Sequence, residues 1–349
     1  MNFGEKILEI DKTKMVDNLG SFSSQIDSSE KVVNATNFTI DKSKVTTIVI
    51  SGLGGSAIGG DLLKTYLERQ IEIPIFVNRS YFLPNFVSDK TLVIASSYSG
   101  NTEETISALK DALKRKAQIM CITTGGEVGK IAEENNLDLV KINGGLQPRE
   151  ALGYSFFGLL CSLAKMGFYE LPAKDIAETK ELLKQKAKDY FVDPNTNFPL
   201  TLAKNLQDKF ILVYGSSDLH KTVAQRWKGQ FCENAEHFSF ANEVPEMNHN
   251  ELVAFTKRNE FSEKVAVINL RDENEFERVQ QRFNLIGRIF TRTAGFATDV
   301  VSEGNSLLAR TFHLIQLGDW TSYYLSILKG IDPTPVEILV NLKEELKKY

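Results

Sequence analysis

Residues 45–70 read VTTIVISGLGGSAIGGDLLKTYLERQ, a β-branched run followed by a glycine and serine turn and then by apolar residues at helical spacing. A buried strand that leads through such a turn into a helix is typical of a parallel sheet, because each parallel crossover needs a helix to cover one face. The stretch therefore predicts an α/β fold that begins near Val45.

The same alternation of strand and helix continues along the chain and then starts again near residue 209. The predicted strands are 73–78, 91–97, 118–124, 137–143, 209–218, 264–270 and 297–303, and the predicted helices are 102–116, 126–136, 149–169, 173–190, 219–235, 273–291 and 306–330. Residues 191–199 are rich in Pro and Asn and are predicted to form a loop between the two series.

These patterns predict two doubly wound parallel-sheet lobes, with a helical extension before the first lobe and a single helix after the second. We expect a helical N-terminal extension at 1–44, a first lobe at 45–152, inter-lobe helices at 153–195, a second lobe at 196–332 and a C-terminal helix at 333–349.

The composition excludes several classes of partner. Lys plus Arg number 41 against 45 Asp plus Glu, so the chain has no cationic excess with which to bind nucleic acid. No apolar stretch is long enough to span a membrane, and the first residues do not resemble a signal peptide, so we expect a soluble cytoplasmic protein.

The cysteines and histidines give no sign of a metal site. The three cysteines, Cys121, Cys161 and Cys232, are widely spaced and are predicted to be buried free thiols. The chain has no HxH, HExxH or CxxC motif, so we expect neither a metal nor another cofactor.

Two turns at the ends of predicted strands carry groups suited to an anion. The first contains Gly55 and Ser56 before a helix, and the second contains Ser97, Ser99 and Thr102, with Thr102 a plausible helix cap. Free backbone N–H groups and neutral hydroxyls suit a phosphate dianion. The first turn is also compatible with dinucleotide binding or close packing, and capping alone explains Thr102.

Two nucleotide-binding motifs do not fit these turns. No Lys follows either turn as a Walker A loop requires, and the spacing of the first turn departs from the dinucleotide-binding fingerprint.

GGSAIGG at 54–60 together with SYSGNTEET at 97–105 resembles the sugar isomerase (SIS) domain, which recognises phosphosugars. PREALGYS at 148–155, KGQFCENAEH at 228–237, EMNHNELVAF at 246–255 and PVEILVNLKEEL at 335–346 are similar to motifs of the bifunctional phosphoglucose/phosphomannose isomerases. The resemblance covers nearly the whole chain from about residue 45.

This resemblance implies an isomerase that interconverts glucose 6-phosphate or mannose 6-phosphate with fructose 6-phosphate through a cis-enediol. It implies that Glu233 moves the proton, that Arg149 stabilises the enediolate, and that His249, contributed by the partner of a homodimer, assists ring opening. Lys343 on the C-terminal helix matches a lysine near the ring oxygen. Thr334 is a candidate pocket residue, with a helix cap as the alternative. We expect Phe231 and Cys232 to raise the pKa of Glu233 by desolvation.

Other functions remain open at this point. Within enzymes, the alternatives are a phosphomannose-only isomerase and an aminosugar-phosphate isomerase without a glutamine-hydrolysing domain, since no Cys follows Met1. Outside enzymes, the alternative is a non-catalytic sugar-phosphate sensor, although residues 1–44 contain no basic output element.

Overall fold

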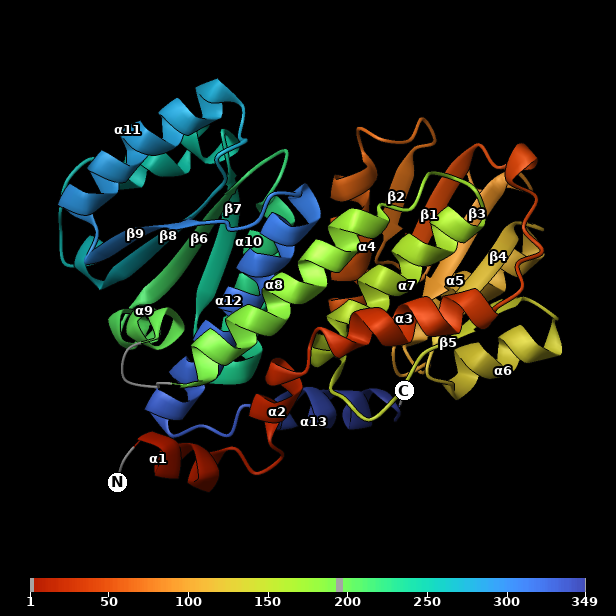
Figure 1. Cartoon of the computed structure of the whole chain (residues 1–349), viewed down its shortest axis with the longest axis horizontal. Coiled ribbons are helices and arrows are strands. Elements are labelled where there is room, and N and C mark those ends of the chain that lie inside the picture. The colour runs from red at the N-terminus through yellow and green to blue at the C-terminus, as the bar shows by residue number, and fades with distance from the viewer. Residues whose placement is uncertain (1–2, 193–196, 349) are drawn as a thin grey trace. The chain divides into compact units, whose positions relative to one another are not determined.

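The computed structural model describes residues 3–192 and 197–348 and folds into two compact units (Figure 1). The N-terminal unit contains residues 21–184 and 305–309. The C-terminal unit contains the chain up to Gly20, residues 185–304 and the chain from Arg310 onward. The chain passes from one unit to the other after Gly20 and again within helix α8 (Ala173–Val192), and residues 305–309 return briefly to the N-terminal unit.

The N-terminal unit is built on a parallel five-stranded sheet with the order β2-β1-β3-β4-β5. Its apolar central strands are buried on both faces, as a parallel sheet covered by helices requires. The strands are β1 (Thr47–Ser51), β2 (Ile75–Asn78), β3 (Thr91–Ser96), β4 (Gln118–Thr123) and β5 (Asp138–Lys141).

Helices cover both faces of this sheet. Val49, Val93 and Cys121 share one apolar core with helices α5 and α6, while Ile50 and Ile122 face α4 and α7 on the other side. The helices of this unit are α3 (Ser24–Ala35), α4 (Gly54–Leu67), α5 (Glu103–Lys114), α6 (Gly126–Glu134) and α7 (Leu152–Lys165). The predicted doubly wound fold is therefore confirmed for this lobe.

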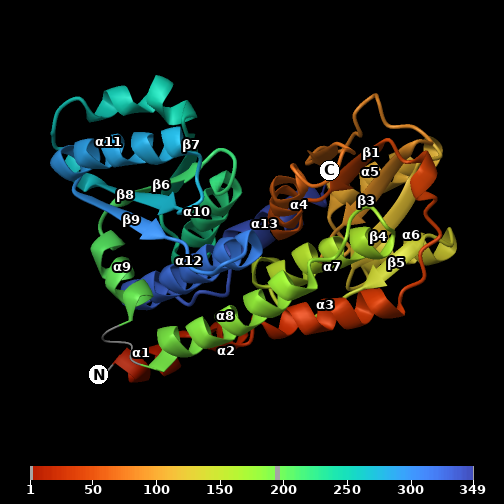
Figure 2. The same cartoon turned by 45° about the horizontal axis from the view of Figure 1, so that its top comes forward.

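The C-terminal unit contains a parallel four-stranded sheet with the order β7-β6-β8-β9. Figures 1 and 2 show α11 on one face of this sheet and α10 and α12 on the other. Tyr214 stacks on Phe290 of α11, while the Trp227 indole of α10 donates to the Leu314 carbonyl of α12 at 2.8 Å. The elements are β6 (Phe210–Ser216), α10 (Lys221–Ala235), β7 (Ser239–Val244), β8 (Val265–Arg271), α11 (Glu277–Thr293), β9 (Phe296–Val301) and α12 (Leu307–Lys329).

Two elements of the C-terminal unit were not predicted. Strand β7 is an edge strand in which Phe240 is exposed and Ala241 to Glu243 are half-buried, so SFANEV lacks the apolar run of a central strand. Helix α9 (Phe198–Leu206) begins inside the predicted loop, because the Asn197 side chain accepts from the Leu200 N–H at 2.8 Å and Pro199 suits a first turn. The loop prediction is wrong at 191–192, which are the last residues of α8, and at 198–199, while 193–196 lie outside the described residues.

The chain ends contribute short helices. The first residues form α1 (Phe3–Ile10) and α2 (Met15–Gly20), and the predicted last helix is α13 (Glu337–Leu346). The α1 and α2 region is joined to the rest of the C-terminal unit by a hydrogen bond from the Tyr323 hydroxyl to Asp11, 3.1 Å long. Every residue of α13 from Leu339 to Leu346 is exposed, and none of the helix is buried.

Candidate active site

The first glycine turn lies where β1 ends and α4 begins, and it allows three backbones to approach one another. A Cβ atom placed on Gly52 would lie 2.7 Å from the Ser96 carbonyl oxygen, and one on Gly55 would lie 2.6 Å from the carbonyl oxygen of Pro148. Gly54, at the start of α4, has a φ of +51°, which favours glycine. The ends of β1 and β3 and the segment before Arg149 therefore meet at this turn.

Ser56 joins the first turn to the second. Its side chain is buried, and its Oγ accepts a hydrogen bond from the backbone N–H of Tyr98 at 3.3 Å. Because the hydroxyl accepts from Tyr98, its own O–H remains able to donate to a bound anion. The two turns predicted from the sequence are thus neighbours at the carboxyl edge of one sheet, where open α/β sheets bind ligands.

The second turn gathers three hydroxyl groups. Ser97 is buried and its Oγ accepts from the Gly100 N–H at 3.1 Å and lies 3.0 Å from the Thr102 Oγ1. The Ser99 side chain is exposed, and its Oγ accepts from the Asn101 N–H at 3.2 Å. Thr102 is the N-cap of α5, but its side chain forms no capping hydrogen bond. Capping therefore does not explain the hydroxyl of Thr102.

The turn around Gly100 is held against the next loop. Gly100 has a φ of +72°, and a Cβ atom there would lie 1.8 Å from the Gly125 carbonyl oxygen. Helices α4 and α5 both begin beside these turns, so their N-termini, which carry partial positive charge, add to the attraction for an anion.

Arg149 is brought to the same edge by the segment that precedes α7. It lies in a 3-10 turn at Pro148–Glu150 and is only 4% exposed. The Leu146 N–H donates to the Tyr98 hydroxyl at 3.1 Å, and the Gln25 amide donates to the Glu150 carbonyl at 2.7 Å. These bonds fix the arginine beside Gly55. The N-terminal unit therefore brings together Gly55, Ser56, Ser97, Ser99, Thr102 and Arg149.

Glu233 lies on the accessible face of α10 in the C-terminal unit and is half-buried. The opposite face of the helix is fixed to α12, since Asp319 accepts from Arg226 at 2.8 Å and from Gln230 at 3.0 Å. Asn234, beside Glu233, donates to the Ser322 hydroxyl at 2.9 Å. The backbone that carries the carboxylate is therefore rigidly placed.

Gly229 is a residue of this site that the sequence analysis did not single out. It stands one turn before Glu233 on the same face of α10, and a Cβ atom there would meet no described atom within 4 Å. Packing against neighbouring atoms therefore does not require a glycine at this position, although a glycine inside a helix costs about 1 kcal/mol relative to alanine. Its effect is to leave space next to the carboxylate.

Cys232 corrects one of the sequence predictions. Cys121 and Cys161 are buried, and burial raises the pKa of each thiol to about 12. Cys232 is exposed, because it shares the accessible face of α10 with Glu233. The prediction of three buried thiols is therefore wrong for Cys232, and this side chain does not bury the neighbouring carboxylate.

His249 lies on the other side of the C-terminal sheet from α10. It is an exposed residue in the 3-10 turn Glu246–His249, whose Met247 is buried in the apolar core beneath α11. The Arg282 guanidinium of α11 donates to the Asn248 side chain at 3.2 Å. The structure thus places His249 and Glu233 on elements that cover opposite faces of one sheet.

The C-terminal segment distinguishes Lys343 from its neighbours. Lys347 pairs with Glu344 at 2.6 Å and Lys348 pairs with Glu345 at 2.5 Å. Lys343 is exposed on α13 and has no ion pair within the described part of the chain.

Thr334 does not cap the C-terminal helix. The N-cap of α13 is Val336, whereas Thr334 is buried and its hydroxyl bonds to the Thr13 hydroxyl. Its backbone N–H donates to the Asp332 carboxylate at 3.1 Å. The alternative interpretation of Thr334 as a helix cap is therefore wrong.

The other histidines have partners inside the C-terminal unit. The buried His220 lies 3.1 Å from the Asp272 carboxylate, and although burial opposes this, its hydrogen bond helps to hold the pKa of Asp272 well below the usual range. His313 is buried, and its Nε2 lies 3.1 Å from the Tyr190 hydroxyl oxygen. The Nε2 of His237 lies 2.6 Å from the Lys209 carbonyl oxygen.

Residues 3–192 and 197–348 contain no cluster of three acidic, histidine or cysteine side chains that could hold a metal ion. Within the same residues, no helix combines the length and apolar character needed to cross a membrane.

Known protein families match both halves of the chain. Residues 41–141 match the SIS domain, and residues 195–346 match the bacterial phospho-glucose isomerase C-terminal SIS domain. Among solved structures, a hypothetical protein of Thermus thermophilus superposes with a TM-score of 0.77 at 14% identity, over 99% of this chain and 93% of that chain. This structural likeness supports the fold.

Two curated relatives carry the same name. A bifunctional phosphoglucose/phosphomannose isomerase of Caldicellulosiruptor bescii is 39% identical over 334 residues, which is 95% of this chain and 98% of the relative. One from Aquifex aeolicus is 35% identical over 86% of this chain and 91% of the relative. With this identity over almost its full length, the chain belongs to the bifunctional phosphoglucose/phosphomannose isomerase family.

Proposed function

We propose that this protein is an isomerase that interconverts glucose 6-phosphate or mannose 6-phosphate with fructose 6-phosphate. The observation that supports this most directly is a cradle of hydroxyl groups at the carboxyl edge of the N-terminal sheet, in a chain of this family. The cradle is formed by Ser56, Ser97, Ser99 and Thr102, and Arg149 is fixed beside it. The cradle has the chemistry of a phosphate site, and the family name gives the two activities.

In this proposal, the phosphate of the substrate is held by Ser97, Ser99 and Thr102, with Ser56 and the backbone of Gly55 beside them. Neutral hydroxyls and N–H groups at two helix N-termini bind a dianion without the cost of an additional buried cation. Because the phosphate does not react, these contacts hold the ground state and the transition state equally.

Glu233 is the proposed base. It removes the proton from C2 of the open-chain aldose, and the electrons form a C1–C2 double bond while the carbonyl oxygen becomes an enediolate. The same carboxyl group then returns the proton to C1. The proton of the C2 hydroxyl moves to the oxygen on C1, which leaves a ketone at C2. Arg149 stabilises the negative oxygen of the enediolate, as a fixed cation does for a developing oxyanion.

Opening of the sugar ring is assigned to His249 and Lys343. An imidazole can donate a proton to the ring oxygen and accept one from the C1 hydroxyl near neutral pH. We propose that His249 acts on the site of the partner subunit in a homodimer. Its exposure, and its position across the sheet from Glu233, support this assignment. Lys343, without an ion pair in the described chain, assists near the ring oxygen from α13.

Acceptance of both aldoses follows from space around the enediol. Glucose and mannose 6-phosphates differ only at C2, so one base serves both when rotation about the C2–C3 bond presents either face of C2 to Glu233. We propose that Thr334 borders the space for this rotation, and that Gly229 contributes to it from α10.

We also propose that the enzyme works in the cytoplasm, in carbohydrate metabolism, without a metal or other cofactor. The test is a coupled assay on the three hexose 6-phosphates, each with and without EDTA. We expect turnover of all three, unchanged by the chelator. Binding of these sugars without turnover would instead identify a sugar-phosphate sensor, and turnover of aminosugar phosphates alone would identify an aminosugar isomerase.

A further inference from the structure

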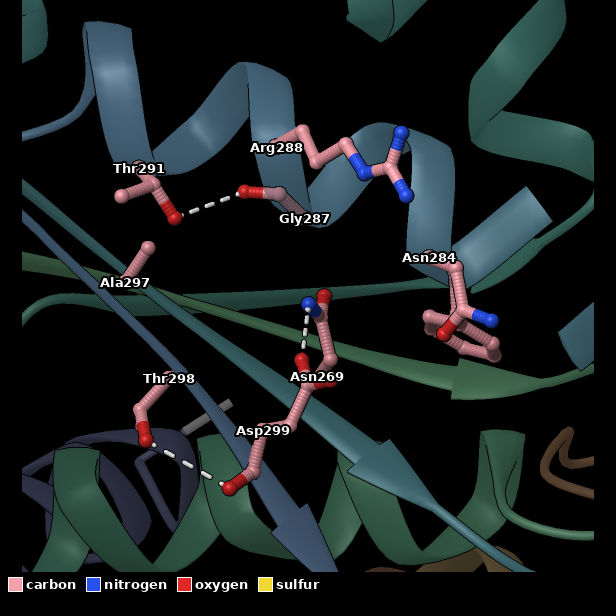
Figure 3. A pocket seen from close by; sticks show the side chains of 9 residues that line it. Asn269, Asn284, Gly287, Arg288, Thr291, Ala297, Thr298 and Asp299 are labelled. Atoms are coloured by element: carbon pink, nitrogen blue, oxygen red, sulfur yellow. Dashed lines mark hydrogen bonds between the residues drawn. The ribbon is translucent and has the colours of Figure 1, made fainter. Parts of the chain in front are cut away.

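A cavity of about 540 Å³ lies between α11 and the strands β8 and β9 in the C-terminal unit (Figure 3). One wall is a single face of α11 with Asn284, Gly287, Arg288 and Thr291, and the other wall includes Asn269 and Asp299 from the two strands. This volume is within the range of small-molecule sites. The cavity is on the α11 face of the sheet, whereas α10, which carries Glu233, covers the opposite face.

Gly287 keeps this cavity open. It lies in the middle of α11, where glycine is a poor helix former, and a Cβ atom built on it meets no described atom within 4 Å. No neighbouring backbone or side chain therefore requires a glycine at this position. The missing side chain is part of the volume of the cavity, since Gly287 lines it.

Asn269 presents an unpartnered acceptor to this space. It interrupts the apolar strand β8, is 1% exposed, and donates from its Nδ2 to the Asp299 carboxylate at 2.8 Å. A carboxylate only accepts, so the amide orientation is fixed, and its Oδ1 has no hydrogen bond among the described residues. Figure 3 shows the amide projecting from β8 toward α11. Buried polar atoms in proteins are nearly always hydrogen-bonded, so a ligand that donates to this oxygen would be favoured.

Arg288 supplies a positive charge to the cavity lining. The Asp299 carboxylate is already paired, with the Arg271 guanidinium at 2.9 Å, and Arg271 also pairs with Glu275 at 3.2 Å. The guanidinium of Arg288, in contrast, has no carboxylate partner within the described chain. A ligand that contacts Arg288 is therefore favoured when it carries a negative charge.

We propose that this cavity is a second ligand site that binds a small hydroxylated anion. A hydroxyl of the ligand donates to the Asn269 Oδ1, and its phosphate or carboxylate group binds the Arg288 guanidinium. Because α11 and α10 cover opposite faces of the sheet, the ligand acts as an effector and not as the substrate of Glu233. The proposal is independent of the isomerase assignment.

The experiment compares two probes, glycerol 3-phosphate and glycerate, which share the hydroxyl and differ in the anion. Binding is measured by titration calorimetry, and the site is located by amide hydrogen exchange. We expect at least one probe to protect residues 284–291 of α11. We expect Gly287→Leu, which fills the cavity, and Arg288→Gln, which removes the charge, each to weaken that binding about tenfold or more.

Arg278→Gln, on the same helix but outside the cavity, is the matched control and should bind as the wild type does. Thermal unfolding checks that each variant folds. If Gly287→Leu does not fold, the binding measured with Arg288→Gln decides the question. Wild-type protein in which neither probe protects α11, or folded variants that bind both probes normally, would overturn the proposal. Isomerase activity of Arg288→Gln without ligand should be unchanged, which separates this site from the catalytic one.

Discussion

The hydroxyl oxygens of Ser97 and Thr102 lie 3.0 Å apart, although Thr102 occupies the N-cap of α5. A threonine at this position ordinarily accepts a hydrogen bond from the first turn of its helix. Here the side chain turns to the neighbouring serine instead. Two hydroxyls held together in front of a helix N-terminus form an arrangement that suits an anion.

The first prediction concerns this pair. Replacing both Ser97 and Thr102 by Ala should raise KM for fructose 6-phosphate at least about 10²-fold, since each hydrogen bond to a charged group contributes roughly 1.5 to 3 kcal/mol. The kcat should change only a few-fold, because the phosphate contacts are equal in ground and transition states. Steady-state kinetics measure both constants. Ser107→Ala, within the same helix, is the control, and a large loss of kcat at unchanged KM would contradict the role.

The second prediction concerns the base. Glu233→Gln keeps the shape of the side chain and removes its ability to accept a proton, so kcat should fall at least ~10²-fold while substrate affinity changes little. Single-turnover and steady-state assays with glucose 6-phosphate provide the measurement. Glu236→Gln, just beyond the end of α10, should retain normal turnover. A Glu233→Gln enzyme with near-normal kcat would remove this residue from the mechanism.

The third prediction concerns the homodimer. Inactive Glu233→Gln protein mixed with inactive His249→Gln protein should regain part of the activity, because each hybrid dimer has one site with both wild-type groups. Subunit exchange is followed with differently tagged chains, and activity is measured on the isolated heterodimer. Heterodimers without activity would mean that both residues act within one subunit.

The fourth prediction separates two roles of Thr334. Thr334→Gln should lower kcat/KM for mannose 6-phosphate more than for glucose 6-phosphate if the side chain borders the substrate. Thr13→Val removes the same hydroxyl pair, and it should cost about 1 kcal/mol of stability without changing the ratio of the two substrates. An unchanged ratio in Thr334→Gln would leave Thr334 a purely structural residue.

The fifth prediction concerns pH and stability. Burial lowers the pKa of His313 to about 4, with the Glu303 carboxylate acting in the opposite direction. Between pH 6.5 and pH 4 the unfolded chain therefore binds a proton at this residue that the folded chain does not bind, so the histidine makes unfolding easier as pH falls.

The wild-type protein should accordingly lose roughly 1 to 2 kcal/mol more stability than His313→Gln when pH falls from 7 to 5. Urea unfolding at the two pH values gives the difference. The comparison with the variant is needed because burial raises the pKa of Glu275 to about 7, and that carboxyl group favours the folded state as pH falls through the same interval. Equal losses in the two proteins would show that His313 does not control this pH dependence.

The sequence was sufficient for the central strands of both sheets because these are continuous apolar runs that only a doubly covered sheet can bury. It failed at β7, whose partly buried edge position leaves no such run, and at α9, whose cap at Asn197 lies within a stretch rich in turn-forming residues. The hydroxyl groups of the two turns that form the proposed phosphate site could also be predicted from the sequence, because both turns follow directly on predicted strands.

The remaining parts of the site depend on contacts between distant residues. No local pattern pairs Thr334 with Thr13, and the two are separated by 321 positions. Gly229 had a local signal that was not used, since a glycine at i−4 from a candidate base inside a helix is unusual. The cavity beneath Gly287 depends on how α11 lies over β8 and β9, which sequence spacing does not specify.

The uneven exposure of the three thiols makes the protein convenient for spectroscopy. Cys121 and Cys161 are buried, and their raised pKa values keep them unreactive, so a maleimide dye at neutral pH should attach to Cys232 alone. The dye would then stand one residue from Glu233 without any engineered cysteine. Substrate present during the labelling reaction should slow it, and emission from the attached dye should report the arrival of each sugar phosphate in real time.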